Sequence, residues 1–177
     1  MTPLVCLLTG GRSRRMGKDK AGLYRDCATQ AIWLSLLVRQ AVGPRVIEVG
    51  GTWTHGDAYL DAGLGPAFAL HEAARAGALG HSGTVIVLPI DLYRLEATGL
   101  RWFVRESLRM PSVLVVDQTP SWVTFGAPVE ILLRRPQDGS LRALTSQLRP
   151  LRVPLPLEEQ FRDSDYPWEL PTTVSAP

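Results

Sequence analysis

The chain has 177 residues, of which 45% are hydrophobic, and its formal net charge is +2. This length and composition indicate a globular chain with its own core and exclude a disordered one. No apolar run approaches the roughly 18 residues that a membrane-spanning helix needs, and no charged stretch precedes the first apolar run, so we expect neither a membrane span nor a signal peptide. The two cysteines, Cys6 and Cys27, are too few for a disulfide framework and form no CxxC pair, so we expect a cytoplasmic protein.

The first predicted element is a buried strand over residues 3–9 (PLVCLLT), and the loop that follows it is strongly basic. Residues 12–20 hold five of the 19 basic side chains and one of the 17 acids, so the rest of the chain is slightly acidic. Such local charge argues against nucleic acid as a partner, because a nucleic-acid site needs a wider basic surface. The only two lysines of the chain, Lys18 and Lys20, both lie in this loop, as expected where an ammonium group contacts a phosphate.

The loop matches neither of two common phosphate-binding motifs. A Walker A loop has four residues between its glycines and a hydroxyl after its lysine, whereas five residues separate Gly11 from Gly17 and Asp19 follows Lys18. The dinucleotide fingerprint GxGxxG is also absent. Gly10 and Gly11 nevertheless let backbone N–H groups approach an anion, and several cations suit a triphosphate better than a single phosphate. The alternative is a surface turn with solvated arginines.

Helices and strands alternate along the rest of the chain. Within the helix expected over residues 66–78, we expect His71 on the surface. In order, the predicted elements are helix 29–42, strand 45–51, helix 66–78, strand 84–91, helix 100–109, strands 112–118 and 122–126, and helices 127–135 and 140–149. Continuously apolar strands that alternate with helices indicate a mostly parallel sheet covered on both faces, with ligands at the carboxyl ends of the strands. We expect one domain over residues 1–170 and a flexible tail over 171–177.

The stretch LTGGRSRRMGKDKAGL, which begins at Leu8, closely resembles the signature L-A-G-G-x-S-x-R-M-G-x-D-K of the molybdenum cofactor guanylyltransferases, with Thr9 where alanine is usual. The resemblance implies a three-layer α/β/α, Rossmann-like (glycosyltransferase-A-like) nucleotidyltransferase fold with a mixed, mostly parallel sheet. It also implies that Arg15 holds the β- and γ-phosphates of a nucleotide and that Lys20 contacts the α-phosphate, where charge develops during transfer. The residues that it places against the guanine nucleotide are Leu8, Thr9, Gly10, Gly11 and Ser13.

Two further stretches resemble the metal-binding motifs of that family. Asp91, in VLPIDLYRL, stands where the family has the aspartate of CDMPF that holds Mg²⁺, although Leu-Tyr replaces the Met-Pro that follows it. FRDSDYPWEL, residues 161–170, resembles F-x-N-x-N-T-P-E-D-L, with Asp163 and Asp165 at the asparagine positions. The resemblance implies Asp91 and Asp163 as Mg²⁺ ligands, and the extra carboxylates should make nucleotide binding more metal-dependent. The alternatives are a carboxylate that caps the next helix and a terminal turn with solvated acids.

The resemblance is less complete on the base side of the nucleotide. GLGPAFAL retains the Gly-Pro of the family's GPLAG at Gly65, but Ala69 replaces its last glycine. Asp61 corresponds to the carboxylate that accepts hydrogen bonds from guanine, with Asp57 as a competing candidate. The family's Asn-x-Asn region appears as VGGTW, where Gly50 and the next glycine offer only backbone groups. We therefore expect Gly50, Asp61 and Gly65 to contact the nucleotide.

The resemblance implies transfer of GMP from GTP to molybdopterin cofactor with release of pyrophosphate, with Arg15, Lys20 and Asp91 as catalytic residues and Mg²⁺ as cofactor. Residues 117–125 would lie beside the acceptor, where Trp122 could stack on a pterin ring. The expected partners are the two substrates, GTP and molybdopterin cofactor, and molybdoenzyme maturation proteins are further candidates. We expect no binding to nucleic acid or to a membrane. The expected oligomeric state is a monomer or a weak oligomer. Two alternatives stay open: a cytidylyl- or sugar-phosphate nucleotidyltransferase of the same fold, and a non-catalytic nucleotide-binding relative that acts through a partner protein.

Overall fold

The computed structural model describes residues 2–10, 19–25, 27–81, 83–163, 170–171 and 174–175. Within them, seven strands form one sheet in the order β5-β4-β1-β6-β8-β7-β9, and three short strands form a second sheet in the order β10-β2-β3. The strands of the large sheet are β1 (Leu4–Leu8), β4 (Val46–Val49), β5 (Ala58–Tyr59), β6 (Thr84–Pro89), β7 (Ser112–Val116), β8 (Thr119–Pro128) and β9 (Arg149–Arg152). Those of the small sheet are β2 (Tyr24–Arg25), β3 (Ala28–Thr29) and β10 (Val174–Ser175). The helices are α1 (Gln30–Ala41), α2 (Pro66–Arg75), α3 (Ala97–Arg109), α4 (Val129–Leu132) and α5 (Leu141–Thr145), with 3₁₀ turns η1 (Lys20–Gly22) and η2 (Leu155–Phe161).

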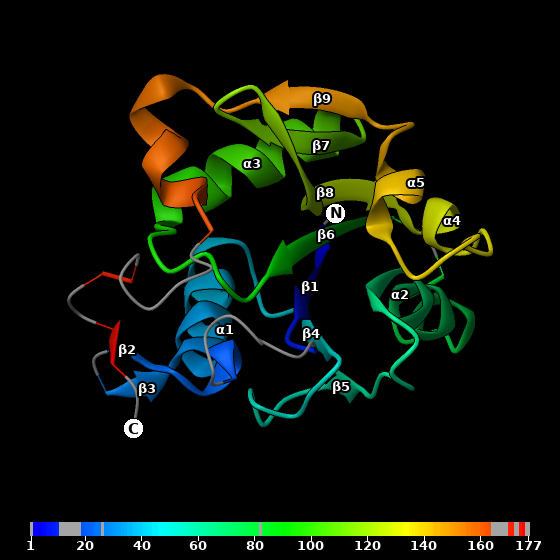
Figure 1. Cartoon of the computed structure of the whole chain (residues 1–177), viewed down its shortest axis with the longest axis horizontal. Coiled ribbons are helices and arrows are strands. Elements are labelled where there is room, and N and C mark those ends of the chain that lie inside the picture. Colours follow the sequence, from blue (N-terminus) through cyan, green and yellow to red (C-terminus); the bar gives the residue numbers. More distant parts are fainter. Residues whose placement is uncertain are drawn as a thin grey trace.

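The large sheet lies between two helical layers (Figure 1). Helices α1 and α3 cover one face, and α2, α4 and α5 cover the other (Figure 1). The alternation of side chains along β1 shows why its sequence is apolar throughout. Leu4, Cys6 and Leu8 belong to the core on the α2 side, whereas Val5 and Leu7 belong to the core on the α1 side. The predicted three-layer α/β/α class is therefore confirmed.

One strand, β8, departs from the parallel arrangement. β1 pairs in parallel with β4 and β6, and β7 with β9, whereas β8 runs antiparallel to both β6 and β7. The turn between β7 and β8 holds Asp117 and Gln118 at φ angles of 47° and 65°, the backbone region of a type I′ hairpin. The predicted strands 112–118 and 122–126 are therefore two arms of one hairpin, and the sheet is mixed but mostly parallel, as predicted.

Several predicted boundaries near the C-terminus are wrong. The predicted helix 140–149 ends at Thr145, and Arg149 begins β9, because a residue that precedes a proline favours extended backbone. The predicted helix 127–135 is reduced to α4, since β8 continues through Pro128. Within residues 171–177, Val174–Ser175 forms β10 and pairs with β2, whereas the rest of the predicted tail stays a prediction.

The predicted position of His71 is also wrong, because this residue lies in the interior of the protein and not on the surface of its helix. Its exposed fraction is 6%, and its Nδ1 atom lies 3.1 Å from the carbonyl oxygen of Leu132 at the end of α4. The sequence pattern missed this contact because it depends on α4, a neighbour that is distant in the chain. A hydrogen-bonded core histidine of this kind needs no catalytic explanation.

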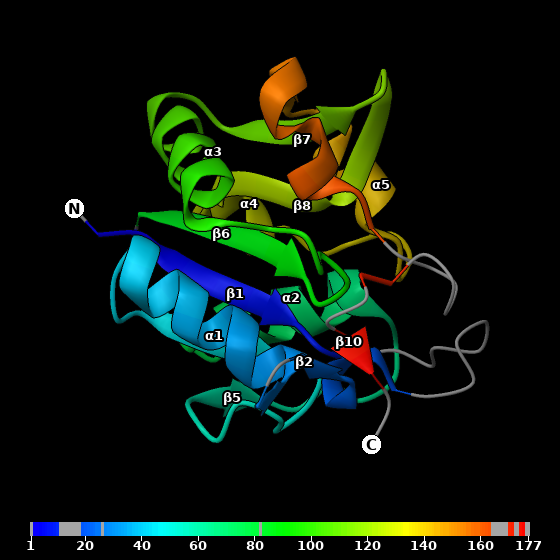
Figure 2. The same cartoon turned by 90° about the vertical axis from the view of Figure 1, so that its left-hand side faces the viewer.

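The carboxyl ends of β1, β4 and β6 meet at one edge of the sheet, and β1 begins at the opposite edge (Figure 2). The strand pair β2 and β10 lies at the carboxyl edge (Figure 2). Among the described residues, no helix is both long and apolar enough to cross a membrane. The fold thus brings the loops after β1, β4 and β6 to one place, where ligands of such sheets bind.

Candidate active site

A buried ion pair lies at the carboxyl edge of the sheet. Asp91 follows the end of β6 and Lys20 opens η1, and Nζ of Lys20 lies 3.0 Å from Oδ2 of Asp91. The two side chains are only 10% and 18% exposed. Asp91 does not cap the following helix, because α3 begins after Glu96, so that alternative is wrong. The structure therefore brings together two residues that are 71 positions apart in the chain and that the sequence assigned to one site.

The surroundings of Asp91 fit a divalent cation. Its Oδ1 atom is buried and has no hydrogen-bond partner within the part of the chain that the structure describes. Burial raises the pKa of the Asp91 carboxyl, the Lys20 ammonium opposes that rise, and the charge of Asp163 adds to it. No group of three or more His, Cys, Asp or Glu side chains that could hold a metal occurs among the described residues. One or two carboxylates with an oxygen to spare are what Mg²⁺ takes from a protein when phosphates and water complete its shell.

Two polar residues to which the sequence analysis assigned no role support the ion pair. Tyr93 is fully buried, and its hydroxyl donates to the carbonyl oxygen of Lys20 over 3.4 Å. Gln30, also fully buried at the start of α1, donates from Nε2 to the carbonyl oxygen of Ile90 over 3.0 Å. The Leu-Tyr that replaces the family's Met-Pro after Asp91 therefore supplies a hydrogen bond to the backbone of the other partner. Only the fold reveals these contacts, because each joins distant parts of the chain.

On the base side, the loops after β1 and β4 touch through their glycines. Gly50 has a φ angle of 107°, and a Cβ atom there would lie 2.4 Å from the backbone nitrogen of Gly10. The backbone N–H of Thr9 donates to the carbonyl oxygen of Val49 over 3.0 Å, so the two loops are also joined by a hydrogen bond. Thr9 is buried, with 3% exposure, at the end of β1 beyond Leu8. Predicted nucleotide contacts Leu8, Thr9, Gly10 and Gly50 therefore lie together at this edge.

We expect the substitution Gly50→Ala to destabilise the fold and the nucleotide site together. The methyl group would meet the backbone of Gly10, and the positive φ adds a strain of about 1 kcal/mol. Gly83→Ala is the matched control, because Gly83 has a similar φ angle of 104° and a Cβ atom there would meet none of the described atoms within 4 Å. Urea denaturation should show a loss for Gly50→Ala that exceeds the loss for Gly83→Ala by about 1–3 kcal/mol. Equal losses would contradict the close packing of the two glycines.

The remaining predicted base contacts lie in the loop before α2. Asp61 is half-buried, and its Oδ1 accepts a hydrogen bond from the backbone N–H of Gly63 over 3.0 Å. Gly65 has a φ angle of 104° and would place a Cβ atom 2.9 Å from the carbonyl oxygen of Gly139. The competing candidate Asp57 is exposed, and its carbonyl oxygen accepts a hydrogen bond from the backbone N–H of Glu48. Asp61 therefore organises its own loop.

Other predicted site residues lie outside the described residues. These are Gly11, Ser13 and Arg15 of the basic loop, and Asp165 of the C-terminal motif. Asp163 is described and exposed, and it follows η2. Its charge acts on Asp91, so these two predicted metal ligands lie in one electrostatic environment.

A cavity of about 430 Å³ lies beside Asp163 at the tip of the β7–β8 hairpin. The hydroxyl side chains of Thr119 and Ser121 line this cavity, and so does Arg162. The guanidinium of Arg162 forms an ion pair with Asp117, with 2.8 Å between Nη2 and Oδ2. Trp122 does not line it; this residue packs against the core on the α2 side, with the Arg142 guanidinium 5.5 Å from its ring centroid. The segment predicted to face an acceptor thus borders a polar cavity, through residues other than Trp122.

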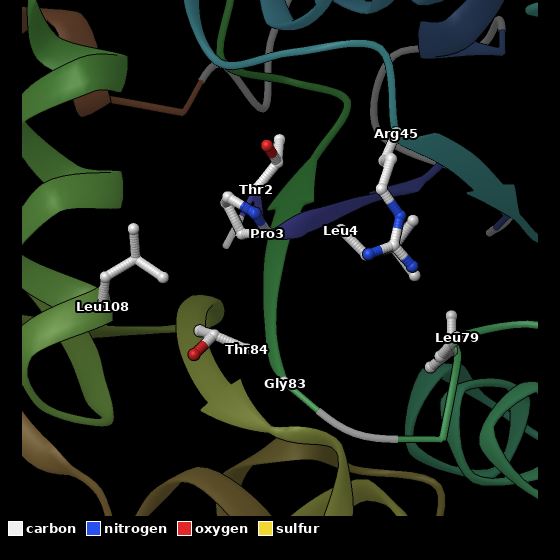
Figure 3. A pocket seen from close by; sticks show the side chains of 8 residues that line it. All are labelled: Thr2, Pro3, Leu4, Arg45, Leu79, Gly83, Thr84 and Leu108. Carbon is white, nitrogen blue, oxygen red and sulfur yellow. The ribbon is translucent and has the colours of Figure 1, made fainter.

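A second cavity, of about 610 Å³, lies at the opposite edge of the sheet (Figure 3). Leu4, Leu79 and Leu108 give it apolar walls, and Arg45 is the charged side chain in its lining (Figure 3). The described lining contains no carboxylate that could hold a metal beside a phosphate. The described lining of this cavity therefore offers no metal site, and Arg45 provides a distant cation for control substitutions.

Comparison with known proteins supports the resemblance seen in the sequence. No protein-family model matches the chain. A curated protein of Opitutus terrae, named "Probable molybdenum cofactor guanylyltransferase", is 27% identical over 187 residues, which cover 90% of this chain and 88% of that protein. The sequence resemblance to the guanylyltransferases is confirmed by this similarity.

Solved structures share the fold. Rv0371c from Mycobacterium tuberculosis H37Rv superposes with a TM-score of 0.64 at 22% identity, over 95% of this chain and 95% of that chain. A manganese complex of Rv0371c gives a TM-score of 0.62 at 18% identity, over 86% of this chain and 89% of that one. A nucleotidyl transferase from Methanothermobacter thermautotrophicus gives 0.64 at 15% identity, over 89% and 90% of the two chains. The predicted three-layer, Rossmann-like α/β fold is confirmed.

Proposed function

We propose that this protein is a cytoplasmic nucleotidyltransferase that transfers GMP from GTP to molybdopterin cofactor and releases pyrophosphate. The observation that carries the proposal is the buried ion pair at the carboxyl edge, which joins Lys20, at the end of the basic loop after β1, to Asp91, after β6. The curated relative supports guanylyl transfer through its name, and the nucleotidyl transferase among the solved structures has the same fold. Nucleotidyl transfer is the general reaction that we propose. Guanine as the base of the donor and molybdopterin as the acceptor are the specific substrates that we propose for it.

The proposed step joins the acceptor to the α-phosphorus of GTP. An oxygen of the terminal phosphate of molybdopterin forms the new P–O bond, and the bond from the α-phosphorus to the bridging oxygen breaks with its electron pair, which leaves as pyrophosphate. The attacking oxygen is already anionic, so no side chain has to remove a proton. The ammonium of Lys20 is proposed to stabilise the charge that develops on the α-phosphate, and Arg15 is proposed to hold the leaving phosphates.

Asp91 and Asp163 are the residues proposed to hold Mg²⁺, which when bound would neutralise phosphate charge. The manganese complex of Rv0371c supports a divalent cation in this fold, bound by that protein. Binding of a metal at Asp91 would relieve the electrostatic repulsion between its carboxylate and Asp163. It would also satisfy the buried Oδ1 atom of Asp91.

We propose that the acceptor occupies the cavity at the β7–β8 hairpin. The hydroxyl of Thr119 can donate a hydrogen bond there, the hydroxyl oxygen of Ser121, which donates to Oγ1 of Thr124 over 3.0 Å, can accept one, and Arg162 is a cation for an acceptor phosphate. Arg162 now pairs with Asp117 and also with Glu159, at 2.7 Å, and its side chain is 48% exposed. An exposed pair of this kind contributes little to stability, so an anionic acceptor can compete for the guanidinium.

Calorimetry with GTP, CTP, ATP and UTP, each with and without Mg²⁺, tests the donor side of the proposal. We expect GTP to bind most tightly and all four nucleotides to bind more weakly without the metal. If CTP binds more tightly than GTP, the proposed guanine specificity is wrong, and the result favours the cytidylyltransferase alternative. Release of pyrophosphate from GTP in the presence of molybdopterin cofactor then tests transfer, and tight GTP binding without release would favour the non-catalytic alternative.

A further inference from the structure

Glu48 is a fully buried carboxylate within the sheet, and the proposed chemistry does not use it. It lies in β4 with 0% exposure, between the core residues Ile47 and Val49. A buried carboxylate is costly unless hydrogen-bond donors surround it. The sequence alone does not single out Glu48, because one acid in an apolar strand carries no motif.

Four donors from the described residues surround this carboxylate. Oε1 of Glu48 accepts from the hydroxyl of Thr9 over 2.6 Å and from the backbone N–H of Trp53 over 2.9 Å. Oε2 accepts from both the backbone N–H and the hydroxyl of Thr54, each over 2.8 Å. One side chain thus ties the end of β1 to the loop after β4. Thr9, where the related family usually has alanine, is one of its partners.

The loop that Glu48 holds reaches across to the turn that carries Lys20. A Cβ atom on Gly51 would lie 2.8 Å from Oε1 of Glu48 and 2.9 Å from the Trp53 ring, so loop and carboxylate pack without space between them. The far end of the Trp53 ring would lie 3.0 Å from a Cβ atom on Gly22, two residues after Lys20. The base side and the phosphate side of the site are therefore in contact through Trp53.

We propose that Glu48 is the positioning residue that fixes the backbone of residues 50–54 for recognition of the nucleotide base. Gly50 and Gly51 have no side chains, and the backbone N–H of Gly50 donates to the carbonyl oxygen of Tyr59 over 2.9 Å, so the carbonyl group of Gly50 and the backbone groups of Gly51 are the ones that can read a base here. The four hydrogen bonds to Glu48 hold Thr9, Trp53 and Thr54, which lie on either side of these groups in space and in sequence. This inference rests on the proposed nucleotide site, and it assigns base recognition to a residue that does not touch the nucleotide.

The substitution Glu48→Gln tests the assignment. An amide puts an NH₂ group against two of the donors, so the loop loses its anchor while the side chain keeps its shape. We expect the nucleoside triphosphate that wild type binds best to bind about 10- to 100-fold more weakly, with KM raised more than kcat is lowered. Inorganic tripolyphosphate, which has no base, should keep its affinity within about twofold. Glu130→Gln, an exposed glutamate in α4, is the control for loss of a carboxylate charge.

Thr9→Val is the second variant. It is used if urea and thermal denaturation show that Glu48→Gln has no cooperative unfolding transition and is therefore not folded. Thr9→Val removes one of the four donors and keeps the shape of the side chain, so we expect a weakening of about 3- to 10-fold for the nucleoside triphosphate alone. Equal weakening of nucleotide and tripolyphosphate, or no weakening in Thr9→Val, would overturn the assignment of Glu48. Wild-type preference for a base other than guanine would overturn the proposed donor, whereas the selective loss in the variants would still support Glu48.

Discussion

The substitution Lys20→Ala is expected to lower kcat for nucleotidyl transfer by about 100- to 1,000-fold, because a preorganised cation at the reacting phosphate would be lost. The chain should remain folded. Asp91 would lose its partner, but the pKa of its carboxyl is already raised by burial, so it can take up a proton and reduce the cost. We expect the free energy of unfolding to fall by about 2 kcal/mol.

Pyrophosphate release under saturating nucleotide, together with urea denaturation, measures both parts of this expectation. Arg45→Ala is the control, since it removes an exposed cation from the opposite edge of the sheet. Unchanged turnover in Lys20→Ala would remove Lys20 from the reacting phosphate. An unfolded Lys20→Ala would instead direct the test to Lys20→Met, which keeps most of the aliphatic side chain.

The substitution Asp91→Asn is expected to lower kcat by about 1,000-fold and to weaken Mg²⁺ binding, because asparagine is a poor replacement for a carboxylate ligand. Its side-chain oxygen can still accept a hydrogen bond from Lys20, so the fold should be retained. Titration of the nucleotide complex with Mg²⁺ by calorimetry reports the metal affinity without any need for turnover. Asp138→Asn is the matched control, since Asp138 is exposed and caps a turn through Oδ1, an atom that asparagine keeps.

Normal Mg²⁺ affinity in Asp91→Asn would contradict the metal role of Asp91 and show that the metal lies elsewhere. If turnover is lost while the affinity stays normal, the role of Asp91 is restricted to holding Lys20. In the double variant Lys20→Ala with Asp91→Asn, the loss of stability should be smaller than the sum of the single losses, because the two side chains contact each other.

Most of the fold could be predicted from patterns along the chain. Apolar strands and amphipathic helices alternate, so the sheet, its layers and its ligand-binding edge followed from local sequence. The two-residue strands β2, β3 and β5 could not be predicted, since so short a run has no periodicity. The burial of His71 depended on contact with α4, and the early end of the helix before β9 depended on Pro150, which favours extended backbone at the residue before it.

The candidate site shows the same division between local motif and distant contact. The basic loop and Asp91 could be identified because they resemble a known motif, and the fold then placed Lys20 against Asp91. Of the two residues that support this pair, Gln30 belongs to no motif, and Tyr93 was visible only as part of the departure from the family's Met-Pro. Thr9 was visible in the sequence as a departure from the family signature. The residue that accepts a hydrogen bond from its hydroxyl, the buried Glu48, lies 39 residues away in the chain, so the sequence did not reveal this contact.

The antiparallel direction of β8 has a consequence for how substrate choice can change during evolution. Because β7 and β8 are joined by the two-residue turn at Asp117 and Gln118, insertions there can lengthen the wall of the adjoining cavity without a shift in the strand pairing behind it. The loops after β1 and β4 belong to the other half of the sheet and would not move. If the acceptor binds in this cavity as proposed, descendants of this chain can acquire a new acceptor through insertions and deletions at one hairpin tip, while the proposed donor half is inherited unchanged.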